Sequence, residues 1–183
     1  CGGRGTRLRP YTTVLPKPLM PLGDQPVLEV VLNRLRAGGV REVTLCVGHL
    51  AEIIQAFFGN GERVGVKIDY AMEDQPLGTV GPLAFVKDLG EDFLVMNGDV
   101  LTDLDYAGLL EGHVGAGAPI TVSTYERTVK IDFGVLEIGN DGGGDEHIAA
   151  FREKPVESFS VSMGIYALSR ETLRGYPAGE ALG

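Results

Sequence analysis

The chain has 183 residues, about the size of one domain, and its 44% hydrophobic content is enough to form a buried core. Its formal net charge of −9 argues against binding to nucleic acid or acidic membranes, because attraction to a polyanion needs clustered Lys and Arg. The charge does not exclude a small phosphate ligand in a local basic pocket. No apolar run approaches the roughly 18 residues that a membrane span requires.

The spacing of cysteines and histidines indicates neither a metal site nor a disulfide. Cys1 and Cys46 lie far apart, so we expect reduced thiols in a cytoplasmic protein. His49, His113 and His147 are scattered along the chain, and we interpret them as surface or turn residues.

Up to about residue 118 the hydrophobic pattern predicts helices alternating with strands. Pro26 suits the first position of a helix with apolar residues at helical spacing, and Gly38-Gly39 ends that helix. Such alternation is typical of parallel strands joined by right-handed crossovers. After the first helix, the expected elements are a strand over 43–47, a helix over 50–58, a strand over 66–71, a helix over 81–89, a strand over 93–96 and a helix over 105–110.

The character of the sequence changes after residue 118. Strands with little helix between them are expected over 120–125, 133–138, 148–151 and 161–168. The predicted fold is α/β, a Rossmann-like layered fold with a mostly parallel, mixed central sheet flanked by helices, plus a strand-rich portion after residue 118. No linker divides the chain, so we expect a single domain with two halves, residues 1–118 and 119–183.

The chain opens on a glycine-rich run, Gly2-Gly3-Arg4-Gly5-Thr6-Arg7-Leu8-Arg9-Pro10. Glycines let backbone N–H groups approach phosphate oxygens and form an anion-binding concavity. The run lacks the Gly-Lys-Ser/Thr of a P-loop, and Leu8 stands where a dinucleotide fingerprint needs its last glycine, which disfavours an oxidoreductase. A glycine-rich turn with surface arginines is the alternative. Because no strand precedes this loop, we expect a further segment before Cys1.

A lysine between two prolines, Pro16-Lys17-Pro18, follows soon afterwards. Both neighbours have a fixed φ, so the segment is stiff and less entropy is lost when the ammonium group holds one position. This stiffness suits a lysine that binds phosphate, although an exposed lysine on a proline-rich loop would give the same pattern.

Taken together, Gly3 to Thr12 and Pro16 to Leu22 closely resemble the signature of the sugar-phosphate nucleotidyltransferases, also called nucleotide-sugar pyrophosphorylases. The family includes mannose-1-phosphate guanylyltransferases and glucose-1-phosphate thymidylyltransferases. The resemblance implies an enzyme that transfers a nucleoside monophosphate from an NTP to a hexose 1-phosphate, giving an NDP-sugar and pyrophosphate. GTP with mannose 1-phosphate is the favoured pair, followed by dTTP or UTP with glucose 1-phosphate.

The resemblance also implies which residues bind the nucleotide. Arg7 and the backbone of the glycine-rich run would hold the leaving phosphates, and Lys17 would bind charge near the α-phosphate. The segment Glu73–Thr79 resembles the loop that recognises the nucleobase, where an amide side chain offers both a donor and an acceptor. The nucleotide-binding residues implied in this way are Gly2, Gly3, Gly5, Thr6, Gln75 and Gly78.

Asp99, in Met96-Asn97-Gly98-Asp99-Val100, follows an expected strand and resembles the family's metal ligand. A carboxylate at the carboxyl end of a strand can hold Mg²⁺, which keeps most of its waters and bridges substrate phosphates. Arg7, Lys17 and Asp99 are therefore the expected catalytic residues. The family's second metal-binding Asp comes later and has no counterpart before Gly183, so we expect a domain that is incomplete at both chain ends.

Two further motifs are expected to bind the sugar phosphate. Asp132-Phe133-Gly134-Val135 resembles the sugar-contacting strand, where Gly134 would offer its backbone N–H to a hydroxyl. In Phe151-Arg152-Glu153-Lys154-Pro155, the resemblance gives Glu153 to the sugar hydroxyls and Lys154 to the phosphate. Gly164 follows in the expected place, although Ser162 stands near where the family often has Asn.

The implied reaction is in-line attack of a sugar-phosphate oxygen on the α-phosphorus of the NTP. It needs alignment of the two substrates and reduced repulsion between their negative charges, rather than a general base. The partners would be an NTP and a sugar 1-phosphate, with neither nucleic acid nor membrane, and the protein could form a homo-oligomer. Two alternatives remain: a noncatalytic domain that senses nucleotide or sugar phosphate, and nucleotidyl transfer to a non-sugar phosphate. The first tends to lose charged motif residues, which are present here.

Overall fold

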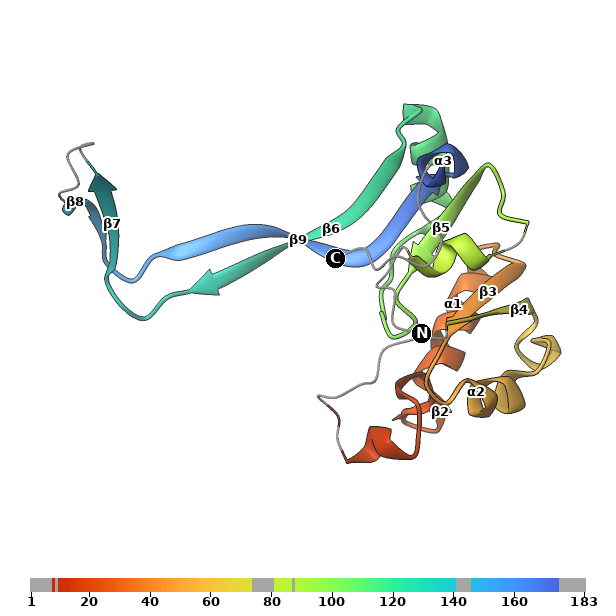
Figure 1. Ribbon diagram of the computed structural model, residues 1–183. Coiled ribbons are helices and arrows are strands. Elements are labelled where there is room, and N and C mark those ends of the chain that lie inside the picture. Colours follow the sequence, from red (N-terminus) through yellow and green to blue (C-terminus); the bar gives the residue numbers. More distant parts are fainter. Residues whose placement is uncertain (1–7, 9, 74–80, 87, 141–145, 175–183) are drawn as a thin grey trace. The chain divides into compact units, whose positions relative to one another are not determined.

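A computed structural model describes residues 8, 10–73, 81–86, 88–140 and 146–174 (Figure 1). The structure is mixed α/β, as predicted from the sequence. It contains two compact units, and the first consists of residues 1–122 and 164–183. Residues 123–163 form the second unit, and strands Ile120–Lys130 (β6) and Val156–Ser169 (β9) contribute residues to both.

The first part of unit 1 is a parallel strand pair with helices. Glu42–Val47 (β3) pairs with Lys67–Met72 (β4) in parallel, from Glu42 opposite Lys67 to Val47 opposite Met72. Helix Ala51–Phe58 (α2) joins the two strands, which confirms the predicted strand–helix–strand connection. The other elements here are the 3-10 helices Tyr11–Thr13 (η2), Lys17–Leu19 (η3) and Glu62–Val64 (η4), the short strands Pro21–Leu22 (β1) and Gln25–Pro26 (β2), and the α-helices Val27–Ala37 (α1) and Ala51–Phe58 (α2).

The rest of unit 1 is built on an antiparallel sheet. Asp92–Met96 (β5) pairs antiparallel with the end of Val156–Ser169 (β9), and Ile120–Lys130 (β6) lies on the other side of β9. Helix Tyr106–Ala116 (α3) is longer than predicted, because its three glycines hide the helical pattern in the sequence. Asp105 caps this helix by accepting a hydrogen bond from the Gly108 N–H at 3.1 Å.

The helix expected over 81–89 is instead a short 3-10 turn, Gly81–Phe85 (η5). Its α-helical continuation stops because Asp88 has a φ of 57°, in the left-handed region that ends helices. A second 3-10 turn, Arg170–Leu173 (η6), follows β9.

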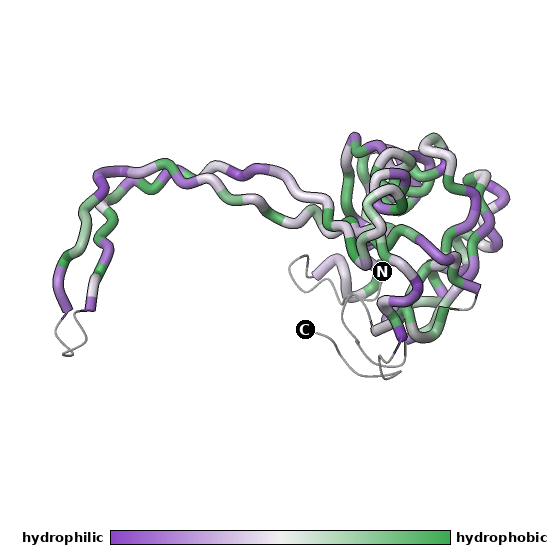
Figure 2. The backbone as a smooth tube through the Cα atoms, turned by 90° about the horizontal axis from the view of Figure 1, so that it is seen from above, coloured by the Kyte–Doolittle hydropathy of each residue, from purple (hydrophilic) through white to green (hydrophobic). Residues whose placement is uncertain are grey.

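Unit 2 consists of strands whose side chains are mostly exposed. Val135–Asn140 (β7) and Glu146–Arg152 (β8) form an antiparallel pair with a register shift between Glu137 and Ile138. Residues 123–130 of β6 and 156–163 of β9 complete the unit. Hydrophobic and hydrophilic residues are interspersed along these strands (Figure 2).

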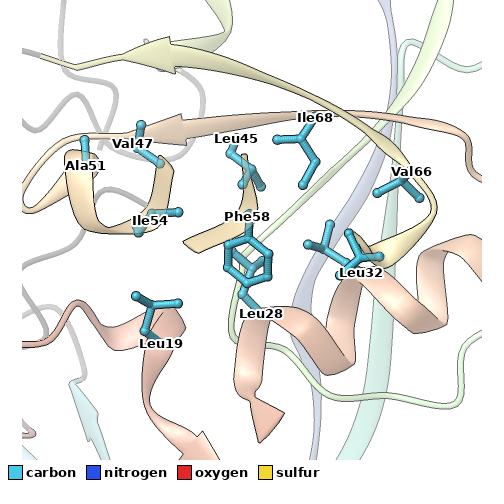
Figure 3. Packing of buried hydrophobic residues seen from close by; sticks show 11 residues of the cluster. Leu19, Leu28, Leu32, Leu45, Val47, Ala51, Ile54, Phe58, Val66 and Ile68 are labelled. Atoms are coloured by element: carbon cyan, nitrogen blue, oxygen red, sulfur yellow. The ribbon is translucent and has the colours of Figure 1, made fainter. Parts of the chain in front are cut away.

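Two clusters of buried side chains form the core of unit 1. The first packs Leu28 and Leu32 of α1 against Leu45 of β3 and Phe58 of α2, and Leu19 of η3 joins it (Figure 3). The second packs Val31 and Leu35, on the same helix, with Tyr106 and Ile165. Burying each such side chain contributes roughly 1.5–3 kcal/mol. The two faces of α1 therefore connect the β3–β4 pair to the β5–β9 sheet.

His113 is fully buried, so its interpretation as a surface or turn residue is wrong. Its Nδ1 lies 2.8 Å from Thr121 Oγ1 and its Nε2 lies 3.1 Å from Ser169 Oγ. The Ser169 hydroxyl donates to Asp92 Oδ1 at 2.6 Å, so its oxygen is left to accept from the His113 Nε2–H. Because Ser169 and Asp92 both approach Nε2, the arrangement is not that of a nucleophile, base and orienting carboxylate. It is a polar network inside the core.

Within the described ranges, no helix combines the length and the apolar character needed to cross a membrane.

Candidate active site

Lys17 lies in a turn that buried neighbours hold in place. Its η3 turn is closed by the Leu19 N–H, which donates to the Pro16 carbonyl at 2.8 Å. Pro18 and Leu19 are buried, and Leu19 is anchored in the first core cluster. The lysine side chain itself is 43% exposed. The core thus fixes the backbone while the ammonium group stays accessible to a ligand.

Asp99 lies in the turn that follows β5. Met96, the last residue of that strand, pairs with Ile165 of β9, and the Asn97 N–H donates to the Gly164 carbonyl at 3.1 Å. The Val100 N–H then closes the turn on the Asn97 carbonyl at 3.4 Å. Asp99 therefore projects from the carboxyl end of a strand, where α/β folds place ligand-binding groups.

Lys17 Nζ and Asp99 Oδ2 form an ion pair, which brings together two site residues predicted from separate motifs. Among the residues whose placement is described, no group of three His, Cys, Asp or Glu side chains could hold a metal. One accessible carboxylate still fits Mg²⁺, because that ion commonly takes one or two protein carboxylates and completes its shell with water and phosphate.

Gly164 has a geometric role beside the Asp99 turn that the sequence did not reveal. Its φ is +72°, and a Cβ added there would lie 2.6 Å from Asn97 Nδ2. Only glycine therefore fits beneath the Asn97 side chain without strain. Asn97 was missed as a candidate, although it adjoins the Gly98-Asp99 motif. It links Gly164 to the Asp99 turn.

A cavity of about 1870 Å³ in unit 1 adjoins the ion pair. Lys17 and Asp99 both line it, together with Leu8 and Asn97. Leu8 of the glycine-rich run and the two charged side chains therefore border the same space. Such a space could receive a phosphate-bearing ligand.

Unit 2 brings together two residues predicted to contact the sugar. A Cβ added at Gly134 would lie 2.7 Å from the Phe151 ring and 3.3 Å from Glu153 Oε2. Gly134 thus leaves room for the Phe151 ring and the Glu153 carboxylate beside it. The Glu153 side chain is 62% exposed, so its oxygens remain available to hydroxyl donors.

Lys154 adopts a backbone conformation that is unusual for a residue with a side chain. Its φ is +44°, in the left-handed region that favours glycine. The Ile131 N–H donates to the carbonyl of Pro155 at 3.0 Å, which holds the following residue. The Lys154 ammonium group lies 4.0 Å from Glu153 Oε1, and the side chains of Lys154 and Glu153 are well exposed. Strained backbone of this kind often occurs at ligand-binding positions.

Seven of the predicted site residues lie outside the described residues. They are Gly2, Gly3, Gly5, Thr6, Arg7, Gln75 and Gly78.

A family model described as "Nucleotidyl transferase" matches residues 1–177. The chain is 34% identical to the UTP–glucose-1-phosphate uridylyltransferase of Synechocystis over 197 residues, covering 97% of this chain and 50% of the relative. It is also 34% identical to the mannose-1-phosphate guanylyltransferase of Mycobacterium tuberculosis over 182 residues, with the same two shares. The chain thus spans about half the length of the curated relatives it matches.

A solved structure agrees with these relatives. The crystal structure of HddC from Yersinia pseudotuberculosis complexed with GMP-PN matches with a TM-score of 0.70 and 26% identity. The match covers 98% of this chain and 78% of that structure.

Proposed function

Because the chain belongs to the nucleotidyl transferase family, we propose that its protein makes a nucleotide sugar from an NTP and a sugar 1-phosphate. An oxygen of the sugar phosphate attacks the α-phosphorus of the NTP and forms the new P–O bond. The bond from the α-phosphorus to the α,β-bridging oxygen breaks, and pyrophosphate leaves with the electron pair. No proton needs to be removed, because the attacking oxygen is already anionic at neutral pH.

The observation that supports this proposal best is the Lys17–Asp99 ion pair, which borders the same cavity as Leu8 of the glycine-rich run. Two polyanions must approach each other in this reaction, so the site needs fixed cations and oriented N–H donors. Lys17 would bind charge near the α-phosphate, and Arg7 with the backbone of Gly2, Gly3, Gly5 and Thr6 would hold the departing phosphates. Gln75 and Gly78 would contact the base.

Mg²⁺ is the proposed cofactor, held by Asp99 together with substrate phosphates and water. When bound, it would neutralise negative charge on the phosphates. Because one described carboxylate is a small share of its coordination shell, most ligands would come from the nucleotide and from solvent.

Gly134, Glu153 and Lys154 are the proposed residues for the sugar phosphate. The accessible Glu153 carboxylate would accept hydrogen bonds from sugar hydroxyls, and the Lys154 ammonium would pair with the phosphate. The Gly134 N–H would donate to a hydroxyl, and Gly164 would support the Asp99 turn. GTP with mannose 1-phosphate is the first candidate pair, and UTP or dTTP with glucose 1-phosphate is the second.

The test is a pyrophosphate-release assay on the full-length protein with Mg²⁺. It pairs each of ATP, GTP, UTP, CTP and dTTP with mannose 1-phosphate, glucose 1-phosphate and phosphocholine. Release with one sugar 1-phosphate supports the proposal, whereas release with phosphocholine alone would point to a non-sugar acceptor. Tight ligand binding without any release would overturn catalysis in favour of a sensor.

A further inference from the structure

The turn between β8 and β9 carries Lys154 in a backbone conformation that its own sequence disfavours. Its φ of +44° lies in the left-handed region, which is costly for a residue with a Cβ. Pro155 follows it directly, and the residue before a proline prefers extended backbone. Such a conformation persists only where the surrounding structure holds it. The contacts on the two sides of this turn therefore decide the direction of the Lys154 side chain.

On the C-terminal side of Lys154, the turn is held by a backbone hydrogen bond. The Ile131 N–H, directly after β6, donates to the Pro155 carbonyl at 3.0 Å. This bond fixes the carbonyl that follows Lys154. It does not fix the peptide planes that precede Lys154, so a second contact is needed at the end of β8.

Arg152, the last residue of β8, supplies that contact through two carboxylates. Its Nε lies 3.2 Å from Glu137 Oε1 on β7, and its Nη1 lies 2.6 Å from Glu157 Oε1 on β9. Arg152 is paired with Val135, two residues from Glu137, so the Arg152 and Glu137 side chains project from the same face of the hairpin. Glu157 is the second residue of β9, beyond the turn. The guanidinium group therefore connects three strands of unit 2 around the turn.

The contact with Glu157 is the more protected of the two. The Glu157 side chain is 26% exposed, and its Oε1 is inaccessible to solvent. The contact is an ion pair rather than an aligned hydrogen bond. A carboxylate with so little access to water depends on a nearby cation. Loss of the Arg152 charge would therefore drive Glu157 toward solvent and separate the start of β9 from the end of β8.

We propose that Arg152 is a positioning residue for the sugar phosphate. Its two ion pairs hold the turn so that Lys154 keeps its left-handed backbone and presents its ammonium group to the phosphate. Without them, Lys154 relaxes to the extended backbone that precedes most prolines, and its side chain takes another direction. Arginine suits this role because its rigid fork of donors can contact two carboxylates at once, whereas a lysine ammonium is a point charge. The inference rests on the proposed function, in which the sugar phosphate is the ligand of Lys154.

The test compares Arg152→Met with Arg127→Met in the full-length protein. Arg127 is an exposed arginine of β6 in the same unit, so its loss changes the net charge equally. Hydrogen exchange at the Ile131 amide reports on the turn without any need for turnover. Pyrophosphate release then gives separate KM values for the NTP and for mannose 1-phosphate or glucose 1-phosphate, whichever is turned over.

Arg152→Met should speed exchange at Ile131 and raise the KM for the sugar 1-phosphate by roughly three- to ten-fold, as expected for loss of two partly exposed ion pairs. The KM for the NTP and kcat should stay within about two-fold of the parent values, because a binding contact for one substrate is affected. Arg127→Met should match the parent protein in all of these measurements.

Three results would overturn the proposal. Unchanged exchange at Ile131 would show that Arg152 does not hold the turn, and faster exchange with an unchanged KM for the sugar 1-phosphate would show that the turn does not place Lys154. An equal rise of both KM values would indicate general loss of structure. If the parent protein releases no pyrophosphate, the proposed function fails instead. Exchange at Ile131 then still tests the turn, and calorimetric affinity for mannose 1-phosphate replaces KM in the same comparison.

Two further variants separate the ion pairs from other effects of the arginine. Arg152→Lys keeps the charge and can pair with one carboxylate at a time, so its KM for the sugar 1-phosphate should lie between those of the parent and Arg152→Met. Glu157→Gln should raise the same KM. Combined with Arg152→Met, it should add no further increase, because both changes remove one contact. Independent, multiplying effects of the two substitutions would contradict the proposed brace.

Discussion

Lys17 Nζ pairs with Asp99 Oδ2 across two separate parts of the core. Lys17 is held by Leu19 in the first buried cluster, whereas the strand before Asp99 packs through Met96 onto the second. The distance between the two charges is thus set by the packing of α1, which contributes to both clusters. A phosphate-binding cation and a metal-binding carboxylate are positioned by the same helix.

The pair is expected to matter for turnover much more than for folding. Lys17→Ala or Asp99→Asn should lower pyrophosphate release by the full-length protein roughly 10²–10³-fold, by analogy with loss of one preorganised donor. Because both side chains are partly exposed, the free energy of unfolding should change by no more than about 1 kcal/mol. Lys130→Ala, at an exposed lysine paired with Asp132, is the matched control and should keep full activity. Near-normal pyrophosphate release by both variants would show that Lys17 and Asp99 are not catalytic residues.

The ion pair should also weaken metal binding in the absence of nucleotide. The Lys17 ammonium competes with a divalent cation for the Asp99 carboxylate. Lys17→Met should therefore raise the affinity for Mn²⁺, used as a paramagnetic substitute for Mg²⁺, by about two- to five-fold, as expected for a partly exposed pair. Electron paramagnetic resonance measures free Mn²⁺ directly, with Lys130→Met as control. Unaltered Mn²⁺ affinity in Lys17→Met would indicate that the metal does not use Asp99.

Gly164→Ala should disturb the Asp99 turn. The added Cβ would collide with the Asn97 side chain, and the positive φ costs a further 1–2 kcal/mol or so. Gly112→Ala is the matched control, because Gly112 lies within α3 and a Cβ there meets nothing within 4 Å. It should gain up to about 1 kcal/mol from helix propensity. Urea unfolding measures both, and equal stability of the two variants would contradict the close Gly164–Asn97 packing.

The alternation of apolar residues was sufficient to predict most helices and strands of unit 1. It failed where the side-chain pattern carries no information about backbone conformation, as at Asp88, whose left-handed φ keeps η5 short. The sequence indicated Lys17 and Asp99 separately through their motifs, but their contact depends on packing between distant segments. The role of Gly164 could not be predicted, because it depends on a through-space approach to Asn97.

His113 illustrates the same limit for a buried polar group, since its partners come from three different strands. His113→Leu should lower the free energy of unfolding by roughly 2–4 kcal/mol, because it leaves Thr121, Ser169 and Asp92 with fewer partners inside the protein. The exposed His49 provides the control, and His49→Leu should change stability by less than about 0.5 kcal/mol. Thermal and urea unfolding distinguish the two. A small loss of unfolding free energy in His113→Leu would show that water replaces the imidazole as a hydrogen-bond partner.

Partly buried Tyr70 and buried Tyr106 should respond differently to loss of the hydroxyl. The Tyr70 hydroxyl donates to the Gly59 carbonyl at 2.8 Å, so Tyr70→Phe should cost about 1 kcal/mol. The Tyr106 hydroxyl is buried without a described partner, so Tyr106→Phe should be neutral or stabilise the chain by up to about 1 kcal/mol at pH 7. Urea unfolding of the 183-residue chain measures both variants. Equal destabilisation would mean that the Tyr106 hydroxyl has a partner.

The same two variants should differ from the parent chain at alkaline pH. Burial raises the pKa of both Tyr70 and Tyr106 above the ordinary value of 10.0. The unfolded chain therefore ionises first, and the stability that the neutral phenols contribute is complete below pH 10 and is lost as the pH rises through the folded-state pKa. Each Tyr→Phe variant should lose less stability than the parent between pH 9 and pH 11. Parallel pH profiles for parent and variants would show that these phenols titrate alike in both states.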